Sequence, residues 1–345
     1  MTVRRIEERS GHDKRCRGGP ADGTGAAAGG RVVILAGPTA SGKSALAIDL
    51  AEQLDGEIVN ADSMQVYRDL PILTAQPSAA DRARVPHHLY GFLDLDDVCD
   101  AQRWAGLAAA ELNAILARGR CPIVVGGTGL YLRALTEGFS PLPEIPPEVR
   151  QAARERVASE GPAAVHAALS ALDPALAARL KPNDRQRIAR GWEVVQATGR
   201  PLSWWQAQAP VPPTAHRFHI IVLAPDRAAL YAAADARFAA MVARGALDEV
   251  RAAAAMRPAG GVVAGGRKAL GYAELAAWAS GRIDPETAIL AAQQATRRYA
   301  KRQSTWFRHQ VAGANFISSD LPAMKFSQSY TAELRHKIRD FLLTL

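Results

Sequence analysis

A short stretch near the start of the chain combines residue types and a spacing that can bind phosphate. It consists of Gly37, Pro38, Thr39, Ala40, Ser41, Gly42, Lys43 and Ser44. The two glycines, with four residues between them, allow backbone N–H groups to curl around phosphate oxygens. Lys43 adds a full positive charge, and the Ser44 hydroxyl can ligate Mg²⁺. The stretch predicts a site for a phosphorylated molecule and leaves the identity of that molecule open.

The elements on either side of this stretch support the same interpretation. Residues 32–35 form an unbroken apolar run, which is typical of a strand buried on both faces of a parallel sheet. Residues 45–50 have the pattern of a helix. The order of strand, glycine-rich turn and helix places a helix N-terminus, with its partial positive charge, behind the phosphates. We therefore predict a P-loop at the carboxyl edge of a parallel sheet.

Two more polar side chains are expected at this edge. A second strand is predicted at residues 58–59, and Asp62 follows its end, where ligands gather in doubly wound sheets. Its carboxylate can bind Mg²⁺ through water, act as a general base or cap the next helix, and the sequence leaves these roles open. A third strand, residues 121–125, runs into the glycine turn 126–129, which contains Thr128. A tight strand-to-helix connection without a ligand is the alternative for this turn.

Composition limits the classes of function. The chain has 345 residues, 48% of them apolar and 22% charged, which is typical of a soluble globular protein. No run approaches the ~18 apolar residues that a membrane span needs. The net charge of +8 favours a polyanionic partner. Cys16, Cys99 and Cys121 are scattered, which fits a reducing compartment and predicts neither a disulfide framework nor a zinc site.

The proline-rich stretch at residues 140–147 marks a domain boundary, because four prolines in seven residues break any helix. The residues that follow are rich in Ala and Arg and lack β-branched runs, so we predict an inserted helical domain. The predicted organisation is a disordered basic extension at 1–30, a core at 31–140 and 212–315, an insert at 141–211 and a C-terminal segment at 316–345.

The second part of the core is predicted to contain a strand at residues 219–223 and a helix at 226–241 that carries Arg237. Residues 260–271 are rich in glycine and predict a flexible loop. A long helix is predicted at 285–309, where basic residues alternate with aromatic residues. This pattern fits stacking on unpaired RNA bases, and it equally fits an amphipathic helix whose aromatic side chains lie in the core.

Two arginines in the insert, Arg187 and Arg190, lie one turn apart on one face of a predicted helix. Such a pair is usually a solvated surface. In a basic protein it is also a candidate for contacts with the phosphate backbone of a nucleic acid.

Taken in order, the motifs resemble those of one family. They are GPTASGKS, NADSMQVYRDL, TAQP, VVGGTGLYLRAL, KPNDRQRIARGWEV, ALGY and AKRQSTWF, and they cover residues 31–310. This order resembles the bacterial tRNA dimethylallyltransferases. The resemblance implies an α/β fold with a P-loop NTPase-like parallel sheet flanked by helices and an inserted all-helical domain. It also implies transfer of a dimethylallyl group from dimethylallyl diphosphate to N6 of the adenosine immediately 3′ of the anticodon, in tRNAs that read codons starting with U.

The resemblance assigns roles to residues of the predicted site. The P-loop, with Thr39 and Arg237, would hold the diphosphate of the prenyl donor. Lys43 and Mg²⁺ would neutralise the charge that builds up on the leaving diphosphate. Asp62 would take the proton from N6, and Thr128 would help to hold the amine or the donor. Because the target base is stacked in the anticodon loop, it must be extruded before it reacts.

The resemblance also assigns contacts with tRNA and implies a cytoplasmic enzyme that acts as a monomer. The matching positions are Asp62, Ser63, Met64, Gln65, Thr128, Arg150, Gln186, Arg187, Ile188, Ala189, Arg190, Lys268, Ala269, Leu270, Gly271, Tyr272 and Ala273. One departure concerns the TAKP motif of the family, where this chain has Gln76 in place of the lysine and Leu73 in place of the preceding glycine.

Three other functions share part of this pattern. An isopentenyltransferase that acts on free adenine nucleotide would share the chemistry, but it needs no helical insert. A small-molecule kinase would share the P-loop, but it would not explain the arginine-rich segments. A nucleotide-dependent RNA-binding switch is disfavoured, because no strand ends in the carboxylate that such proteins use to hold Mg²⁺.

Overall fold

The computed structural model describes residues 29–256, 265–311, 315–317, 336 and 338–341. The chain divides into two compact units: the first unit contains Met1–Thr136 and Pro213–Leu345, and the second unit contains Glu137–Pro212. The predicted insert, 141–211, lies within the second unit. The predicted extension, 1–30, falls outside the described residues except for its last two glycines.

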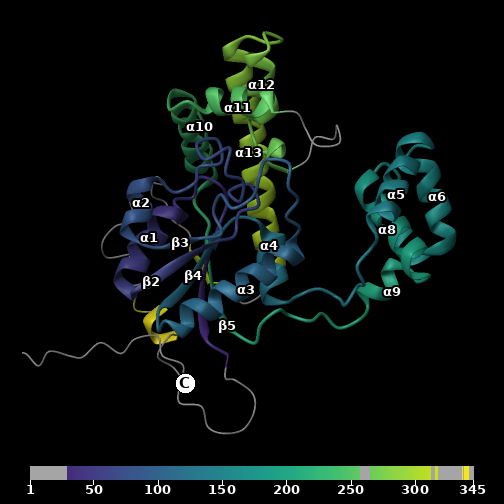
Figure 1. The fold of residues 1–345 in the computed structure, drawn as a ribbon, viewed down its shortest axis with the longest axis horizontal. Coiled ribbons are helices and arrows are strands. Elements are labelled where there is room, and N and C mark those ends of the chain that lie inside the picture. Colours follow the sequence, from purple (N-terminus) through teal and green to yellow (C-terminus); the bar gives the residue numbers. More distant parts are fainter. Residues whose placement is uncertain (1–28, 257–264, 312–314, 318–335, 337, 342–345) are drawn as a thin grey trace, which may run out of the picture. The chain divides into compact units, whose positions relative to one another are not determined.

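The first unit is built around one sheet in which all neighbouring strands are parallel (Figure 1). In spatial order the strands are β3 (His87–His88), β2 (Gly56–Asn60), β4 (Cys121–Gly126), β1 (Arg31–Ala36), β5 (Arg217–Leu223) and β6 (Asn315–Ile317). The four strands predicted from the sequence are confirmed as β1, β2, β4 and β5. The predicted fold class, a parallel α/β sheet with flanking helices, is confirmed as well.

Helices cover both faces of this sheet. In chain order the helices of the first unit are α1 (Lys43–Leu54), α2 (Ala79–Arg84), α3 (Ala101–Ala117), α4 (Gly129–Thr136), α10 (Arg227–Ala243), α11 (Ala246–Ala255), the short 3₁₀ helix η2 (Gly265–Lys268), α12 (Tyr272–Ala279) and α13 (Pro285–Gln310). The connections from β1 to β2 and from β2 back to β4 run in opposite directions across the sheet. Because such crossovers are right-handed, α1 and α3 lie on opposite faces.

The apolar run of β1 explains this two-sided cover. Val33 and Leu35 pack with Leu50 of α1 in one buried cluster. Val32 and Ile34, whose side chains point to the other face, are also fully buried. The central strand is therefore enclosed on both faces, and the loop that follows it leaves the sheet from a fixed position.

A second helical layer lies at one end of the sheet, where Figure 1 shows α10, α11 and α12 grouped together. Helices α10 and α12 both pack against the long helix α13. Their shared core contains Phe238 and Met241 of α10, Leu275 of α12 and Ala292 of α13. This core places the inner faces of α10 and α13 beside the carboxyl edge of the sheet.

The prediction of a flexible loop at 260–271 is wrong for the part that the structure describes. Gly265, Gly266 and Arg267 are buried in η2, and residues 257–264 lie outside the described residues. A Cβ on Gly265 would lie 2.2 Å from the carbonyl oxygen of Leu95, and Gly265 has a φ of 59°. The glycines therefore permit close packing and a left-handed turn here.

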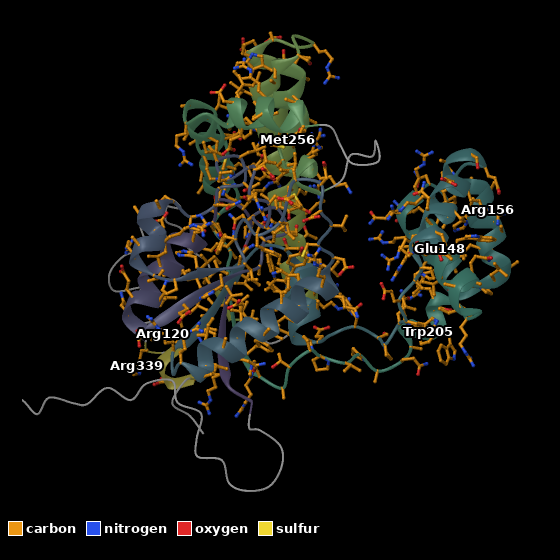
Figure 2. The ribbon with its side chains drawn as sticks, viewed as in Figure 1. Arg120, Glu148, Arg156, Trp205, Met256 and Arg339 are labelled. Atoms are coloured by element: carbon orange, nitrogen blue, oxygen red, sulfur yellow. The ribbon has the colours of Figure 1, made fainter. Side chains whose placement is uncertain are left out.

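The second unit contains five helices and no strand among its described residues, as predicted, with one isolated β-bridge between Phe139 and Val211. It contains α5 (Pro147–Ser159), α6 (Pro162–Leu172), α7 (Pro174–Ala177), α8 (Arg185–Thr198) and α9 (Leu202–Gln206). The segments that enter and leave it are paired, because the N–H of Val211 donates to the carbonyl of Phe139 at 3.0 Å. Figure 2 labels Glu148 and Arg156 on α5 and Trp205 on α9. Trp205 packs against one of the two small cores of this unit.

None of the helices in the described part of the chain has the length and hydropathy needed to cross a bilayer. Of the predicted C-terminal segment, Phe316 and Ile317 belong to β6. Further along, Ile338 is fully buried and joins the sheet core next to α1.

Candidate active site

The turns that follow β1, β2 and β4 meet at one edge of the sheet. Ala36 at the end of β1 pairs with Gly126 at the end of β4, so the two strands end level with each other. The turn after β4 is tied to the turn after β2, because the N–H of Thr128 donates to the carbonyl of Ala61 at 3.2 Å. A Cβ on Gly126 would lie 2.1 Å from that carbonyl oxygen, so only glycine permits this approach.

The P-loop forms the turn after β1. Gly42 has a φ of 84° and Ala40 a φ of 65°, so the loop curls through the left-handed region twice before α1 begins. Gly42 is the N-cap of α1, and no side chain in the described part of the chain caps this helix end. The Ser41 hydroxyl is buried and has no hydrogen-bond partner among the described residues. A free helix N-terminus and an unpartnered hydroxyl together make a cradle for an anion.

A cavity of about 260 Å³ lies beside this loop. Its polar lining residues are Thr39, Asp62, Ser63, Thr74, Arg237, Lys268, Thr296, Tyr299 and Arg302. Its apolar lining residues are Met64, Leu73, Ala234, Phe238, Met241, Ala269 and Leu270. All of these residues belong to the first unit. The cavity can therefore accommodate a molecule that has a charged end and an apolar end.

Helix α10 presents both kinds of side chain to the cavity. Ala234, Phe238 and Met241 are spaced by four and three residues, so they share one helix face. Arg237 lies on the same face and donates a hydrogen bond to the Thr39 hydroxyl of the P-loop. Thr39 and Arg237, which the family resemblance assigns to the donor diphosphate, are therefore in direct contact.

Lys43 and Arg237, here called the inner cations, lie deep in the protein, although part of each side chain is accessible. Burial lowers the pKa of Lys43 to about 8, an effect that the nearby Asp62 carboxylate opposes and Arg237 reinforces. Burial also lowers the pKa of Arg237, again opposed by Asp62. Within the described residues neither inner cation has an acidic side chain in salt-bridge contact. Two partly dehydrated positive charges therefore share one carboxylate, an arrangement that favours binding of an anion.

Asp62 is held in a turn rather than at a helix end. Its N–H donates to Asn60 Oδ1 at 2.8 Å, and its own Oδ1 accepts from the N–H of Met64 at 2.9 Å. The next helix along the chain is α2, which begins at Ala79, so a role for Asp62 as the cap of a helix is excluded. The carboxylate of Asp62 lines the cavity, and Asp62 is the one acidic residue in the described lining.

Thr128 and Ser44 stand outside this lining. Thr128 Oγ1 accepts from the N–H of Ser63 at 2.9 Å and lies 3.3 Å from the Ser63 hydroxyl, so it supports the turn that carries Asp62. Ser44 is exposed and lines a smaller neighbouring cavity of about 90 Å³, together with Gln65.

Two charged groups, the half-buried Glu249 and the buried Arg267, hold segments that line the main cavity. Glu249 of α11 accepts from the N–H groups of Ile72 and Leu73 at 2.7 and 2.9 Å. Burial raises the pKa of Glu249, and these two hydrogen bonds oppose the rise. Arg267 donates to Asp96, Tyr272 and two backbone carbonyls, which anchors η2 and the adjacent Lys268.

The structure shows where Gln76 of the TAQP segment lies, the residue that replaces the lysine of the family motif. Gln76 donates to the carbonyl of Tyr67 at 2.7 Å and lines the smaller cavity. It is absent from the lining of the main cavity, whereas Leu73 contributes an apolar surface there. At the position where the family has a lysine, this protein therefore has a neutral side chain that binds the backbone at Tyr67 and lies outside the lining of the main cavity.

The aromatic residues of the long helix α13 differ in burial, and one of them lies against a basic side chain, because the guanidinium carbon of Arg302 is 5.5 Å from the centre of the Tyr299 ring. Phe307 is 1% exposed, and Trp306 packs edge-on against it with ring centroids 5.3 Å apart. Tyr299 lines the cavity. The basic residues Arg298, Lys301, Arg302 and Arg308 are exposed. The amphipathic interpretation therefore holds for Phe307.

In the second unit the predicted RNA-binding residues of α8 differ in exposure. Gln186 and Arg187 are exposed, whereas Ile188 and Ala189 are buried in a core cluster of the unit. Arg187 pairs with Asp184 at 2.7 Å, and Arg190 pairs with the buried Glu193. Ile188 and Ala189 can position these arginines, but their side chains cannot reach a ligand. Arg150 of α5 is partly buried.

In the predicted ALGY segment, Ala269 and Leu270 reach the cavity along with Lys268. Gly271 and Tyr272 are buried beneath them, and Ala273 is exposed away from the lining.

A buried glutamine of α13, which the sequence motifs did not single out, also belongs to the site. The buried positions of this helix are Ala288, Ala292, Thr296, Ala300, Gln303 and Phe307. Gln303 therefore interrupts an otherwise small or apolar stripe, a signal that helical periodicity could have revealed. Its side chain contacts both the P-loop and the turn after β4.

Fold and site together define a P-loop α/β protein with a helical insert, and comparisons with known proteins agree. The family model described as IPP transferase matches residues 65–310, and a second model, isopentenyl transferase, matches residues 30–85. The tRNA dimethylallyltransferase of Parvibaculum lavamentivorans is 51% identical over 315 residues, which cover 91% of this chain and 98% of that protein. The tRNA dimethylallyltransferase of Rhodospirillum centenum is 54% identical over 284 residues, covering 82% of this chain and 90% of that protein.

Solved structures give the same result. A tRNA isopentenylpyrophosphate transferase from Bacillus halodurans superposes with a TM-score of 0.65 at 32% identity, covering 90% of this chain and 96% of the other. A eukaryotic dimethylallyltransferase, described as acting on tRNA, superposes with a TM-score of 0.74 at 28% identity, covering 90% of this chain and 79% of the other. The chain belongs to the IPP transferase family.

Proposed function

We propose that this protein transfers a dimethylallyl group from dimethylallyl diphosphate to N6 of the adenosine immediately 3′ of the anticodon. Its tRNA substrates would be those that read codons starting with U. The observation that carries the proposal is the pair of inner cations beside a cavity with a large apolar wall. A prenyl diphosphate combines these two properties in one small molecule. Family membership over most of the chain supports the tRNA acceptor.

The donor would bind with its diphosphate on the P-loop. The backbone N–H groups of Ala40 and of Gly42 to Ser44, at the free N-terminus of α1, would face the phosphates. The N–H of Ser41 instead donates to the carbonyl of Pro38 at 3.2 Å, and the unpartnered Ser41 hydroxyl would supply a further donor. Lys43 and Arg237 neutralise the charge. The prenyl chain would lie along Phe238 and Met241. The contacts with the diphosphate become stronger as the allylic C–O bond breaks, because negative charge then moves onto the leaving diphosphate.

The acceptor amine would approach from the side of Asp62. The N6 nitrogen is a weak nucleophile, since its lone pair is delocalised into the purine ring. As the bond between N6 and the allylic carbon forms, the carboxylate of Asp62 accepts the N6 proton. Thr128 acts through Ser63 by holding the Asp62 turn in place. The products are the N6-dimethylallyl base, diphosphate and a protonated Asp62 that returns its proton to solvent.

Mg²⁺ is proposed as the cofactor. Among the described residues, no three His, Cys, Asp or Glu side chains gather to form a metal site. The donor set nevertheless fits Mg²⁺, which takes one or two protein oxygens and obtains its other ligands from phosphates and water. The exposed hydroxyl of Ser44 at the start of α1 is the proposed protein ligand. When bound, the ion would supply further charge neutralisation on the diphosphate.

The tRNA partner is proposed to contact both units. In the first unit, the exposed cations of α13 and Lys268 of η2 can neutralise phosphates near the cavity. In the second unit, Arg187 and Arg190 are the candidates for backbone contacts. We propose a cytoplasmic enzyme that acts as a monomer.

An assay with labelled dimethylallyl diphosphate and Mg²⁺ tests the proposal, with unmodified tRNA and free adenosine monophosphate as acceptors. We expect label on tRNA alone. Label on the mononucleotide would instead support the isopentenyltransferase that acts on free nucleotide. If neither acceptor is labelled while ATP binds tightly, the P-loop serves a nucleotide and the proposal is overturned.

A further inference from the structure

One buried side chain connects the two loops that the proposed reaction needs. Gln303 of α13 is 5% exposed. Its Oε1 accepts a hydrogen bond from the N–H of Thr39 in the P-loop at 2.8 Å. Its Nε2 donates to the carbonyl of Gly127, in the turn after β4, at 2.8 Å. A single planar amide therefore sets the separation between the loop proposed for the donor and the turn that carries Thr128.

The fit around this amide is tight. A Cβ on Gly127 would lie 2.3 Å from Gln303 Nε2 and 2.9 Å from the carbonyl oxygen of Gly37. The turn after β4 is thus close to both the glutamine and the P-loop. Any side chain at this glycine would push the two loops apart.

The rest of the connection reaches the proposed reacting groups. Thr39 also accepts from Arg237 through its hydroxyl, so Gln303 fixes the backbone of a residue that an inner cation contacts. On the other side, the residue after Gly127 is Thr128, whose hydroxyl holds the Asp62 turn through Ser63. Hydrogen bonds, joined by short stretches of backbone, therefore connect Arg237 through Thr39 and Gln303 to the turn that carries Asp62.

We propose that Gln303 is a positioning residue that sets the distance between the donor diphosphate and Asp62. This proposal rests on the proposed function and adds a residue that touches neither substrate. Because the side chain is buried, replacing it leaves a backbone N–H and a carbonyl without partners unless the loops shift. A shift of about 1 Å at reacting groups can cost about 100-fold in rate.

Paired variants at this position test the proposal. Gln303→Met keeps approximately the same length but makes neither hydrogen bond, and we expect it to lower kcat roughly 10- to 100-fold at saturating donor and tRNA. Ser304→Ala is the matched control, because the one hydrogen bond of the Ser304 hydroxyl to a described residue goes to the carbonyl of Ala300 in its own helix, at 2.9 Å. The control should keep the wild-type kcat, and circular dichroism should confirm that both variants are folded.

Gln303→Glu separates positioning from general packing. The ionised carboxylate can still accept from the N–H of Thr39, but it faces the carbonyl oxygen of Gly127 without a proton to share. A protonated carboxyl restores that donor. We therefore expect the kcat of Gln303→Glu, divided by that of the wild type at the same pH, to rise as the pH falls from 8 to about 5.5. The ratio for Gln303→Met should stay constant.

These outcomes decide between the inference and the function on which it rests. If the wild type itself transfers no prenyl group to tRNA, the proposed function fails. If the wild type is active and Gln303→Met keeps its kcat, the positioning role is overturned. A pH-independent ratio for Gln303→Glu would likewise overturn the role of the hydrogen bond to Gly127.

Discussion

The inner cations, Lys43 and Arg237, differ in solvation from the two arginines of α8. The inner cations lack an acidic partner in salt-bridge contact within the described residues, and burial lowers the pKa of both. Arg187 and Arg190 each pair with an acid three residues away on their own helix segment, and 74% of the Arg187 side chain is exposed. The two pairs of positively charged residues therefore differ in burial and in whether an acidic side chain pairs with them.

This difference has a physical consequence for binding. An inner cation is only partly hydrated, so an anion that reaches it recovers a large electrostatic energy and loses little to screening by salt. The arginines of α8 are hydrated and already paired, so each adds a small and salt-dependent increment. We expect the first region to determine catalysis and the second to adjust affinity for RNA.

The largest effect should come from the one carboxylate beside the inner cations. Asp62→Asn keeps the oxygen that accepts from the N–H of Met64 but removes the base. We expect transfer to fall by roughly 10²- to 10⁴-fold, with tRNA binding nearly unchanged. Single-turnover kinetics with labelled donor, together with a filter-binding assay, measure both quantities. A residual rate near that of the wild type would remove the general-base role.

A smaller effect should appear in the pH dependence of donor use. With its pKa lowered to about 8, Lys43 is charged below that pH and loses its proton above it. The value of kcat/KM for the donor should therefore fall by up to about tenfold for each pH unit above 8. Lys43→Arg is the matched variant, because its side chain stays charged and its profile should lack this decline. A decline of equal steepness in both proteins would assign the titration to another group.

The smallest effect should come from α8. Arg187→Ala should weaken tRNA binding only a few-fold and make the slope of log K against log salt less steep by about 1. Arg251→Ala is the control, since Arg251 pairs with Asp248 in the same i,i+3 arrangement on α11 and is also exposed. If both variants have the salt slope of the wild type, Arg187 belongs to a solvated face.

The local patterns of the sequence predicted the sheet well. The apolar runs of β1, β2, β4 and β5 are intrinsic to the chain, and the order of strand, glycine turn and helix fixed the location of the P-loop. Strand β3 was missed because its two histidines carry no strand pattern, and pairing with β2 produces it. The glycines of η2 predicted flexibility, yet they are buried because the loop near Leu95 packs against them.

The site was predicted less completely, because its geometry depends on contacts between distant parts of the chain. Asp62 stood out as a carboxylate after the end of a predicted strand, whereas Arg237 was singled out by the family resemblance. The apolar wall at Leu73, Phe238 and Met241 forms only when α10 packs over the TAQP segment. The role of Gln303 depends on its hydrogen bonds with the backbone of Thr39 and Gly127. A short motif cannot predict these partners, because they are far from Gln303 in the sequence.

The hydrogen bond between Thr39 and Gln303 also affects how the protein is made. Its two residues are separated by 264 positions. At typical elongation rates of about 5–20 residues per second, the P-loop is synthesised roughly 13–53 s before its partner. A nascent or prematurely terminated chain that ends before α13 lacks this contact and one wall of the cavity. Such a fragment should therefore be unable to transfer the prenyl group.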